Sequence, residues 1–206
     1  IAGVTDLLLS LSEKLHIPIA STLMGTGSVP ASYPLYTGLI GMHGTRVSNK
    51  VVSECDLLIN IGARFSDRVI SDMKRFAPNA RIMHIDADPA EINKNISVQF
   101  ALTGNTDLIL QGILDRTTPV DETEWAITVK NLKEEYRLQF PENGTLRPSY
   151  IIQKFNELTG SDAIITTEVG QNQIWAAQFY EYMRPRQYIS SGGLGTMGYG
   201  TGAAIG

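Results

Sequence analysis

The sequence predicts an α/β fold: a Rossmann-like middle domain with a parallel sheet, followed by the incomplete start of a second α/β domain. Two observations support this prediction. Amphipathic helical patterns alternate with short apolar runs, as they do where helices connect the strands of a parallel sheet. Hydrophobic residues also make up 43% of the 206 residues and charged residues 18%, which is enough for a sizeable core and excludes a disordered chain.

The pattern is clearest in the first half of the chain. Residues 4–15 carry apolar side chains at helical spacing, and a run over 57–61 that is apolar except for Asn60 ends at Gly62. A similar run over 81–85 ends at the acidic residues Asp86 and Asp88. In chain order we expect a helix over 4–15, a strand over 17–20, a loop over 25–36, a helix over 45–55, strands over 57–61, 81–85 and 96–102, and a helix over 106–114 capped by Asn105 or Thr106.

Residues 115–122 interrupt this alternation with threonine, proline and acidic residues. There follow an amphipathic surface helix over 125–138, a linker over 140–148, a helix over 149–158, a strand over 163–167, a helix over 172–180, a strand over 187–190 and a glycine-rich loop. We therefore expect a domain over 1–115, a connector over 116–147 and the truncated start of a second domain over 148–206. The chain begins without a methionine and stops within a helical pattern, so we interpret it as a piece of a longer polypeptide.

Composition makes several functions unfavourable. The net charge is −4 and there is no long basic run, which disfavours nucleic acid and anionic membranes as partners. The single cysteine, Cys55, excludes an internal disulfide and cysteine-based zinc sites, and three scattered histidines form no obvious metal cluster. There is no signal peptide and no apolar run of about 18 residues, so we expect a cytoplasmic protein.

Two glycine-containing segments in the first domain are candidate anion sites. Gly41-Met42-His43-Gly44 precedes an expected helix, whose first backbone N–H groups could face a phosphate, although an ordinary tight turn is the simpler interpretation. The segment over 62–68 follows an apolar strand, and its two arginines, Arg64 and Arg68, could hold a diphosphate. A solvated loop with local Arg–Asp pairs is the alternative.

The acidic pair after the next strand is a candidate ribose site. A carboxylate at a strand end, such as Asp86, can accept hydrogen bonds from ribose hydroxyls. The chain has no G-x-G-x-x-G motif, so this is not a standard dinucleotide fingerprint. Asp88 before Pro89 is also a plausible helix cap, whether or not a ligand binds.

The second domain has two further candidate segments. Residues 168–173 lead from a strand into a helix, where backbone amides could face an anion. Residues 191–198 contain four glycines, which permit close approach of the backbone to a ligand. A flexible linker is the alternative for this loop, but the apolar Leu194 and Met197 argue against it.

Several single residues are expected to be structural. We expect Cys55 to be a small core residue at a helix end. We expect His84, within an apolar strand, to be a core histidine whose hydrogen bonds are satisfied. Trp125 and Tyr136 lie at helical spacing and are expected to pack. Among the histidines, only His43, in its glycine-bounded turn, is interpreted as functional.

Five segments together resemble one known family. They are residues 39–45 (LIGMHGT), 61–69 (IGARFSDRV), 84–88 (HIDAD), 169–180 (VGQNQIWAAQFY) and 185–206 (PRQYISSGGLGTMGYGTGAAIG). In this order they resemble the catalytic large subunit of the acetolactate synthase (acetohydroxyacid synthase) family of thiamine diphosphate enzymes. Two positions depart from the family pattern, because Ser66 replaces the usual aspartate and Asn172 the usual histidine.

The resemblance implies a domain order and a set of cofactors. A pyrimidine-binding domain would precede Ile1, residues 1–115 would be the FAD-binding middle domain, and residues from 148 would begin the thiamine diphosphate-binding domain. The activating glutamate and the ligands of Mg²⁺ would lie outside this chain. The resemblance therefore assigns no catalytic residue and no metal ligand here.

The resemblance also implies cofactor contacts, residue by residue. Flavin contacts would be Thr22, Leu23, Met24, Gly41, Met42, His43, Gly62, Ala63, Arg64, Arg68, Asp86, Ala87, Asp88, Gly104 and Asn105. Thiamine diphosphate contacts would be Val169, Gly170, Gln171 and Asn172 at the diphosphate and Gly195, Thr196 and Met197 at the aminopyrimidine, with Met197 as an apolar wedge.

The implied reaction condenses two pyruvates, or pyruvate and 2-oxobutyrate, with release of CO₂ in valine, leucine and isoleucine biosynthesis. FAD would be structural, the full-length enzyme would be a homodimer or tetramer, and a regulatory small subunit would be a candidate partner. The chain alone is expected to be inactive. The alternatives are another flavin-containing relative, such as glyoxylate carboligase or a pyruvate oxidase-like enzyme, and a stand-alone nucleotide-binding module.

Overall fold

The computed structural model describes residues 3–137 and 146–206. Helices and strands alternate along the chain in the order α1 (Thr5–Leu15), β1 (Ile19–Ser21), the short 3₁₀ helix η1 (Leu23–Gly25), β2 (Tyr36–Leu39), α2 (Arg46–Glu54), β3 (Leu57–Ile61), α3 (Asp67–Ile70), β4 (Arg81–Asp86), η2 (Pro89–Glu91), β5 (Phe100–Thr103), α4 (Thr106–Arg116), α5 (Glu124–Glu135), α6 (Pro148–Thr159), β6 (Ile165–Thr167), α7 (Gln171–Phe179), β7 (Tyr188–Ser190) and α8 (Tyr199–Ile205).

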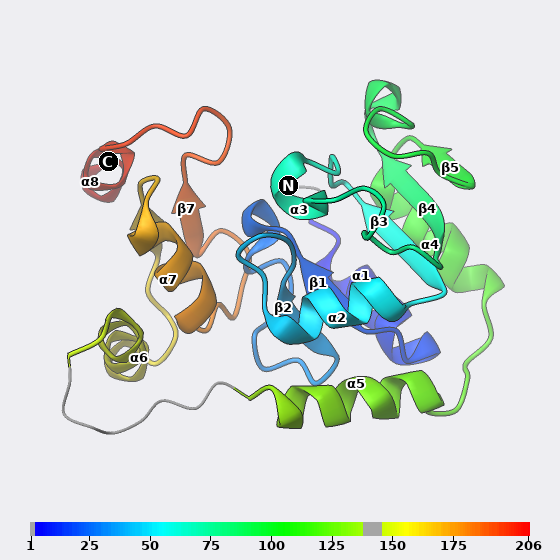
Figure 1. The fold of residues 1–206 in the computed structure, drawn as a ribbon, viewed down its shortest axis with the longest axis horizontal. Coiled ribbons are helices and arrows are strands. Elements are labelled where there is room, and N and C mark those ends of the chain that lie inside the picture. The colour runs from blue at the N-terminus through cyan, green and yellow to red at the C-terminus, as the bar shows by residue number, and fades with distance from the viewer. Residues whose placement is uncertain (1–2, 138–145) are drawn as a thin grey trace.

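The strands of the described residues form three parallel sheets. They pair as β1–β2, β3–β4–β5 and β6–β7, and every pairing is parallel. Figure 1 shows β3, β4 and β5 at one end of the molecule, β7 toward the other end, and β1 and β2 between them. The sequence prediction of an α/β fold with a parallel sheet is thus confirmed.

The three-stranded sheet is covered on both faces. Side chains alternate between the two faces of a strand. On one face of β4, Ile85 packs with Leu11 of α1 and Leu110 of α4, and Ile85 and Leu110 are fully buried. On the other face, Ile82 packs with Phe65 from the loop after β3. Because both faces are covered, the carboxyl edge of the sheet is the part at which polar loops gather.

Helix α5 packs against the first sheet-bearing unit. Val129, which is fully buried, lies in one apolar cluster with Val47 and Val51 of α2. Trp125 and Tyr136 pack at the edge of this cluster, as their helical spacing predicts. Of the linker expected over 140–148, residues 140–145 lie outside the described part of the chain.

Two strands differ most from the sequence prediction. Residues 36–39 form β2, although the sequence predicts a loop that ends at residue 36 and no helix or strand over 37–39, because this short segment carries a glycine and becomes a strand only by pairing with β1. Strand β5 begins at Phe100 rather than at Ile96. The reason is that Ile96 and Val98 pack into the apolar cluster around Phe65 instead of joining the sheet.

Two of the residues expected in the core have different outcomes. Cys55 is buried at the end of α2, where its thiol donates to the Val52 carbonyl at 3.3 Å, which confirms the expectation. His84 is fully buried, but neither ring nitrogen has a hydrogen-bond partner. The expectation of satisfied hydrogen bonds is therefore wrong, because the ring packs against Phe65 and the nearby Asp86 Oδ2 lies 3.6 Å from Nε2, beyond hydrogen-bond distance.

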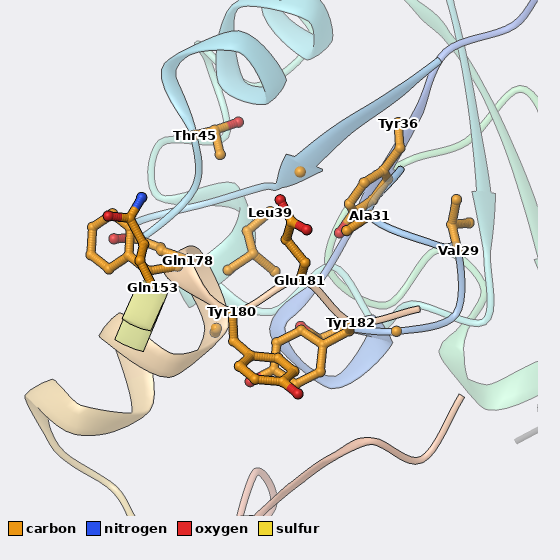
Figure 2. Close-up of a pocket in the computed structure, with 15 residues that line it drawn as sticks. Val29, Ala31, Tyr36, Leu39, Thr45, Gln153, Gln178, Tyr180, Glu181 and Tyr182 are labelled. Carbon is orange, nitrogen blue, oxygen red and sulfur yellow. The ribbon is translucent and has the colours of Figure 1, made fainter. Parts of the chain in front are cut away.

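The two α/β units are in direct contact. The backbone N–H of Ala31 donates to the Tyr182 carbonyl at 2.9 Å, and Leu39 of β2 shares an apolar cluster with Tyr180 and Tyr188. A cavity of about 260 Å³ lies at this junction, between β2 and the residues that end α7 (Figure 2). Burial raises the pKa of Tyr182 and of Tyr188, so both phenols stay neutral at physiological pH.

Candidate functional site

The candidate residues lie where strands end. In chain order, Thr22–Met24 follow β1, Gly41–His43 follow β2, Gly62–Arg68 follow β3, Asp86 ends β4, Gly104 and Asn105 follow β5, Val169–Asn172 follow β6, and Gly195–Met197 follow β7. Ligands of open α/β sheets bind beyond the carboxyl ends of the strands. Each candidate segment therefore lies at the carboxyl ends of the strands of its own sheet, which is where such sheets bind ligands.

The Gly41 turn is fixed from two sides. Asn49 of α2 clamps it, because the Gly41 N–H donates to Asn49 Oδ1 at 2.9 Å and Asn49 Nδ2 donates to the Gly41 carbonyl at 3.0 Å. On the other side, the Met42 N–H donates to the Arg68 carbonyl at 2.8 Å. Gly41 has φ +101°, and a Cβ there would lie 2.4 Å from the Arg68 carbonyl oxygen. Only glycine permits the two predicted segments to meet so closely.

Two asparagine side chains hold the backbone of the loop after β3. Asn60 Nδ2 donates to the Ala63 carbonyl at 2.6 Å, and Asn95 Nδ2 donates to the Arg64 carbonyl at 2.9 Å. Phe65 adopts a left-handed φ of +50° and is 5% exposed. This conformation is unfavourable for a bulky residue, so burial of the Phe65 ring must maintain it.

Both arginines of this loop extend into solvent. The Arg64 side chain is exposed and has no partner within the described residues. Arg68 is 72% exposed and lies 3.9 Å from the Asp67 carboxylate. The local Arg–Asp pair expected as the alternative is therefore present for Arg68, but it is a weak surface pair. Both guanidinium groups remain accessible to an anion.

The carboxylates after β4 have separate roles. Asp86 Oδ1 accepts from the Asp88 N–H at 2.9 Å, and the side chain of Asp86 is 13% exposed. Asp88 Oδ1 accepts from the Ala90 N–H at 2.9 Å and caps η2, so the expected cap before Pro89 is confirmed. Ala87 and Asp88 are exposed. Asp86 is thus the more enclosed of the two acids.

Backbone hydrogen bonds join the carboxyl edges of β3, β4 and β5. The Gly62 N–H donates to the Ile85 carbonyl at 2.8 Å, and the Gly104 N–H donates to the Asp86 carbonyl at 3.1 Å. Asn105 occupies the cap position of α4 but makes no side-chain cap hydrogen bond. The segments over 41–43, 62–68, 86–88 and 104–105 are consequently linked into one rim, which we call the nucleotide rim.

The segment after β1 contacts the second unit. Thr22 caps η1, where its hydroxyl accepts from the Gly25 N–H at 3.3 Å. Met24 is 58% exposed, and a Cβ at Gly192 would lie 1.8 Å from the Met24 sulfur. Gln178 Nε2 of α7 also donates to the His43 carbonyl at 2.7 Å. The structure thus brings the two sets of candidate residues, predicted separately, against one another.

In the second unit, polar contacts join the two strands. Thr167 Oγ1 lies 2.9 Å from Ser190 Oγ, and Gln173 Nε2 donates to the same hydroxyl at 2.7 Å. Gly170 occupies the N-cap position of α7 and has no side chain to cap the helix, and Gln171 and Asn172 are exposed. The N–H groups of Gln171 and Asn172 are therefore available to an anion, whereas the Gln173 N–H donates to the Gly170 carbonyl.

The glycine-rich segment 191–198 is open to solvent. Leu194 is 96% exposed and Met197 is 80% exposed. The Thr196 N–H donates to Ser191 Oγ at 3.0 Å, which shapes the turn. Gly200 of α8 packs against β6, since a Cβ there would lie 3.0 Å from the Glu168 nitrogen. The loop is therefore attached at its end while its apolar side chains remain without cover from the described residues.

The residues present fit a dinucleotide and a second diphosphate. The nucleotide rim offers two accessible guanidinium groups, an enclosed carboxylate and a turn with no room for a Cβ at Gly41. The second unit offers an uncapped helix start beside an apolar, glycine-rich loop. No group of three or more His, Cys, Asp or Glu side chains within residues 3–137 and 146–206 could hold a metal ion.

Sequence reasoning missed the residues that hold the rim together. Asn49, Asn60 and Asn95 each fix a backbone group of a predicted segment. An asparagine inside a helix or strand gives no signal of the distant carbonyl that it contacts. Phe65 gave no signal either, because its backbone conformation depends on the packing of its ring.

The cavity at the junction is a separate feature. Val29, Tyr36 and Leu39 line it on one side, and Gln178 and Tyr182 line it on the other (Figure 2). None of the residues predicted to contact cofactors lines it. Within the described part of the chain, no helix is long and apolar enough to cross a membrane.

Comparisons with known proteins agree with this geometry. Residues 1–113 match the family described as "Thiamine pyrophosphate enzyme, central domain", and residues 168–206 match "Thiamine pyrophosphate enzyme, C-terminal TPP binding domain". Thiamine pyrophosphate is another name for thiamine diphosphate.

Curated relatives span the whole chain. A protein of Methanocaldococcus jannaschii named "Probable acetolactate synthase large subunit" is 41% identical over 100% of this chain and 36% of its own length. "Acetolactate synthase isozyme 2 large subunit" of Escherichia coli is 40% identical over 92% of this chain and 34% of its length. "Acetolactate synthase 3, chloroplastic" of Brassica napus is 46% identical over 94% of this chain and 31% of its length. The chain therefore spans about a third of the length of these relatives.

Proposed function

The chain belongs to the family of thiamine pyrophosphate enzymes, and from this premise we propose that it is part of the catalytic large subunit of an acetolactate synthase. The complete enzyme would condense two pyruvates, or pyruvate and 2-oxobutyrate, with release of CO₂ on the route to branched-chain amino acids. The observation that carries this proposal is the nucleotide rim, in which four predicted flavin segments meet at the carboxyl ends of β2, β3, β4 and β5, strands of two sheets.

The nucleotide rim would hold FAD in a structural role. Arg64 and Arg68 would contact the diphosphate, because planar guanidinium groups bind phosphate oxygens in pairs. Asp86 would accept hydrogen bonds from ribose hydroxyls at the adenosine end. Thr22–Met24 would lie near the flavin ring, and the backbone of the Gly41 turn would approach the cofactor. Gly104 and Asn105 would contact the adenosine end of the cofactor from the side beyond Asp86–Asp88.

The second unit would hold part of thiamine diphosphate, which when bound supplies an electron sink for decarboxylation of a 2-oxo acid. The free N–H groups at the start of α7 would donate to the diphosphate. Met197 would press its apolar side chain against the aminopyrimidine and fix its orientation. Together with Leu194, it would also exclude water from the reacting carbon.

The proposal includes a division of the chain and a set of partners. Residues 1–115 would form the middle domain, 116–147 a connector and 148–206 the beginning of the thiamine diphosphate domain. The complete enzyme would use Mg²⁺, assemble as a homodimer or tetramer, bind a regulatory small subunit and work in the cytoplasm. The chain by itself would make no acetolactate, and measurable turnover of pyruvate by the purified chain would contradict this part of the proposal.

Other functions predict different behaviour. A glyoxylate carboligase or a pyruvate oxidase-like enzyme would share the flavin and thiamine diphosphate sites and differ in the substrate used by the complete protein. A stand-alone nucleotide-binding module would bind FAD and would not depend on residues 148–206. Deletion of 148–206 therefore separates the module from the enzyme, because removal of the contacts at Met24 and His43 should weaken FAD binding in the enzyme.

A titration with FAD tests the flavin site. We expect saturable quenching of flavin fluorescence by the purified chain, and at least a tenfold weaker affinity for the variant R64Q/R68Q, since each arginine would donate charged hydrogen bonds. The matched control is R81Q, because Arg81 is also exposed but lies at the amino end of β4. Equal affinity of R64Q/R68Q and R81Q would contradict the proposed site.

A further inference from the structure

His84 is a buried polar residue that makes no side-chain hydrogen bond. Its side chain is fully buried, and neither Nδ1 nor Nε2 makes a hydrogen bond. An unsatisfied buried polar group destabilises a protein relative to an apolar side chain of similar shape. Residues that break this rule are concentrated at functional sites. A role for His84 must therefore be sought in what surrounds its ring.

The ring of His84 lies between two parts of the nucleotide rim. Its Nε2 is 3.6 Å from Asp86 Oδ2, and its ring meets the Phe65 ring edge to face, with centroids 5.1 Å apart. Ile82, His84 and Asp86 share one face of β4 because side chains alternate along a strand. His84 thus contacts both the carboxylate that ends β4 and the aromatic anchor of the loop that carries Arg64.

Without His84, only one of the two oxygens of the Asp86 carboxylate is held by a hydrogen bond. Its Oδ1 accepts from the Asp88 N–H at 2.9 Å, whereas Oδ2 faces the imidazole at a distance beyond a normal N–H···O hydrogen bond. Movement of a few tenths of an ångström would close that gap. Each carboxylate oxygen can accept two hydrogen bonds, so both oxygens keep capacity for a ligand hydroxyl.

We propose that His84 is a positioning residue for Asp86, whose carboxylate it holds, through Nε2–H and Oδ2, in the orientation that accepts hydrogen bonds from the ribose hydroxyls of a nucleotide cofactor. The proposal rests on the proposed flavin site. His84 acts through Asp86 and through Phe65, and it does not contact the cofactor. An apolar residue at 84 would fill the same space but leave Oδ2 free to rotate.

The tautomer of His84 tests the link to Asp86 without any ligand. Three histidines are present, so long-range ¹H–¹⁵N spectra can assign the His84 ring by its absence in H84Q. We expect the Nε2–H tautomer, and a shift of both ring nitrogens in D86N. The matched control is D88N, which alters an exposed acid two residues away and should leave the His84 signals unchanged. The Nδ1–H tautomer, or indifference of the ring to D86N, would overturn the proposal.

A double-mutant cycle on FAD affinity tests the positioning role. We expect H84L to weaken FAD binding about tenfold, and H84Q, which keeps a side-chain N–H donor, to weaken it less. In the D86N background, H84L should change the affinity less than twofold. Equal losses in the two backgrounds would show that His84 only packs. If the unsubstituted chain binds no FAD, the proposed flavin site fails, while the tautomer experiment still decides the His84–Asp86 link.

Discussion

The nucleotide rim and the glycine-rich segment over 191–198 solve different physical problems. In the rim, loops from separate strands hold one another by backbone hydrogen bonds, and the ring of Phe65 is 5% exposed. In the glycine-rich segment, Leu194 and Met197 are 96% and 80% exposed. The rim is thus shaped by contacts within the described chain, whereas the glycine-rich segment is not.

The same contrast extends to the elements behind each region. The sheet under the rim is covered by α1 and α4, with Leu110 fully buried. Helix α6 in the second unit has no buried residue, and Leu158 is 85% exposed. A cavity of about 260 Å³ opens between α6 and β6, lined by Phe155 and Ile164. The difference teaches that a conformationally free loop needs a packed neighbour before it can present a fixed surface.

The largest test of this comparison removes one apolar side chain from each region. L110A should lower the free energy of unfolding by about 3 kcal/mol, because it leaves a cavity in a packed core. L194A should change it by less than about 0.5 kcal/mol, because the side chain is already exposed. Urea denaturation measures both when it is followed at Trp125, in the helix that packs against the first unit, and at Trp175, in the second unit. Similar losses for the two variants would remove the basis of the comparison.

Cys55 reports how rarely the first unit opens. Burial raises the pKa of this thiol from about 9 to about 11, so at pH 7.5 its thiolate is about 100-fold scarcer than that of an unperturbed thiol. Alkylation should therefore be slow, and its rate should rise with pH, since deprotonation supplies the nucleophile. The rate of thiol labelling at several pH values measures this, with the urea-unfolded chain as reference. Fast labelling of the folded chain would show that the first unit is not the more closed one.

Alanine substitutions at two glycines of the rim distinguish the cost of steric crowding from the cost of backbone strain. G41A should cost about 3 kcal/mol, since it adds a clash with the Arg68 carbonyl to an unfavourable positive φ. G62A should cost about 1 kcal/mol, because Gly62 also has a positive φ, at +64°, but a Cβ there would meet nothing within 4 Å. Chemical denaturation of both variants gives the difference. An equal cost would mean that the Gly41 turn and the Arg68 loop are not in firm contact.

A modest effect is expected when a single buried hydroxyl is removed from the second unit. Tyr180 is 4% exposed, and its hydroxyl accepts from the Ala163 N–H at 2.9 Å and lies 3.0 Å from Thr159 Oγ1. Y180F should cost about 1 kcal/mol, because it leaves a backbone N–H without its acceptor. Thermal unfolding monitored at Trp175 measures the effect, and Y150F, at an exposed tyrosine, is the matched control. Identical melting of Y180F and Y150F would show that this hydroxyl carries no stability.

Much of the fold was predictable because local patterns carry it. The run over 57–61, apolar except for Asn60, coincides with β3, and the helical stripes over 4–15 and 45–55 coincide with α1 and α2 to within one residue at each end. Strand β2 and the start of β5 were not predictable. The former depends on a partner strand, and the latter on side chains that pack elsewhere.

The sequence by itself determined that the candidate segments follow strand ends, because glycines, arginines and acids come directly after largely apolar runs. Only the tertiary structure decided that Gly41 lies against Arg68, that Phe65 sustains a left-handed backbone, and that His84 stands unpaired beside Asp86. The physical reason is the sequence separation over which the interactions act. Periodicity and turn chemistry act over a few neighbouring residues, whereas the hydrogen bonds and ring contacts that shape the rim join residues that only the packing of the sheet brings together.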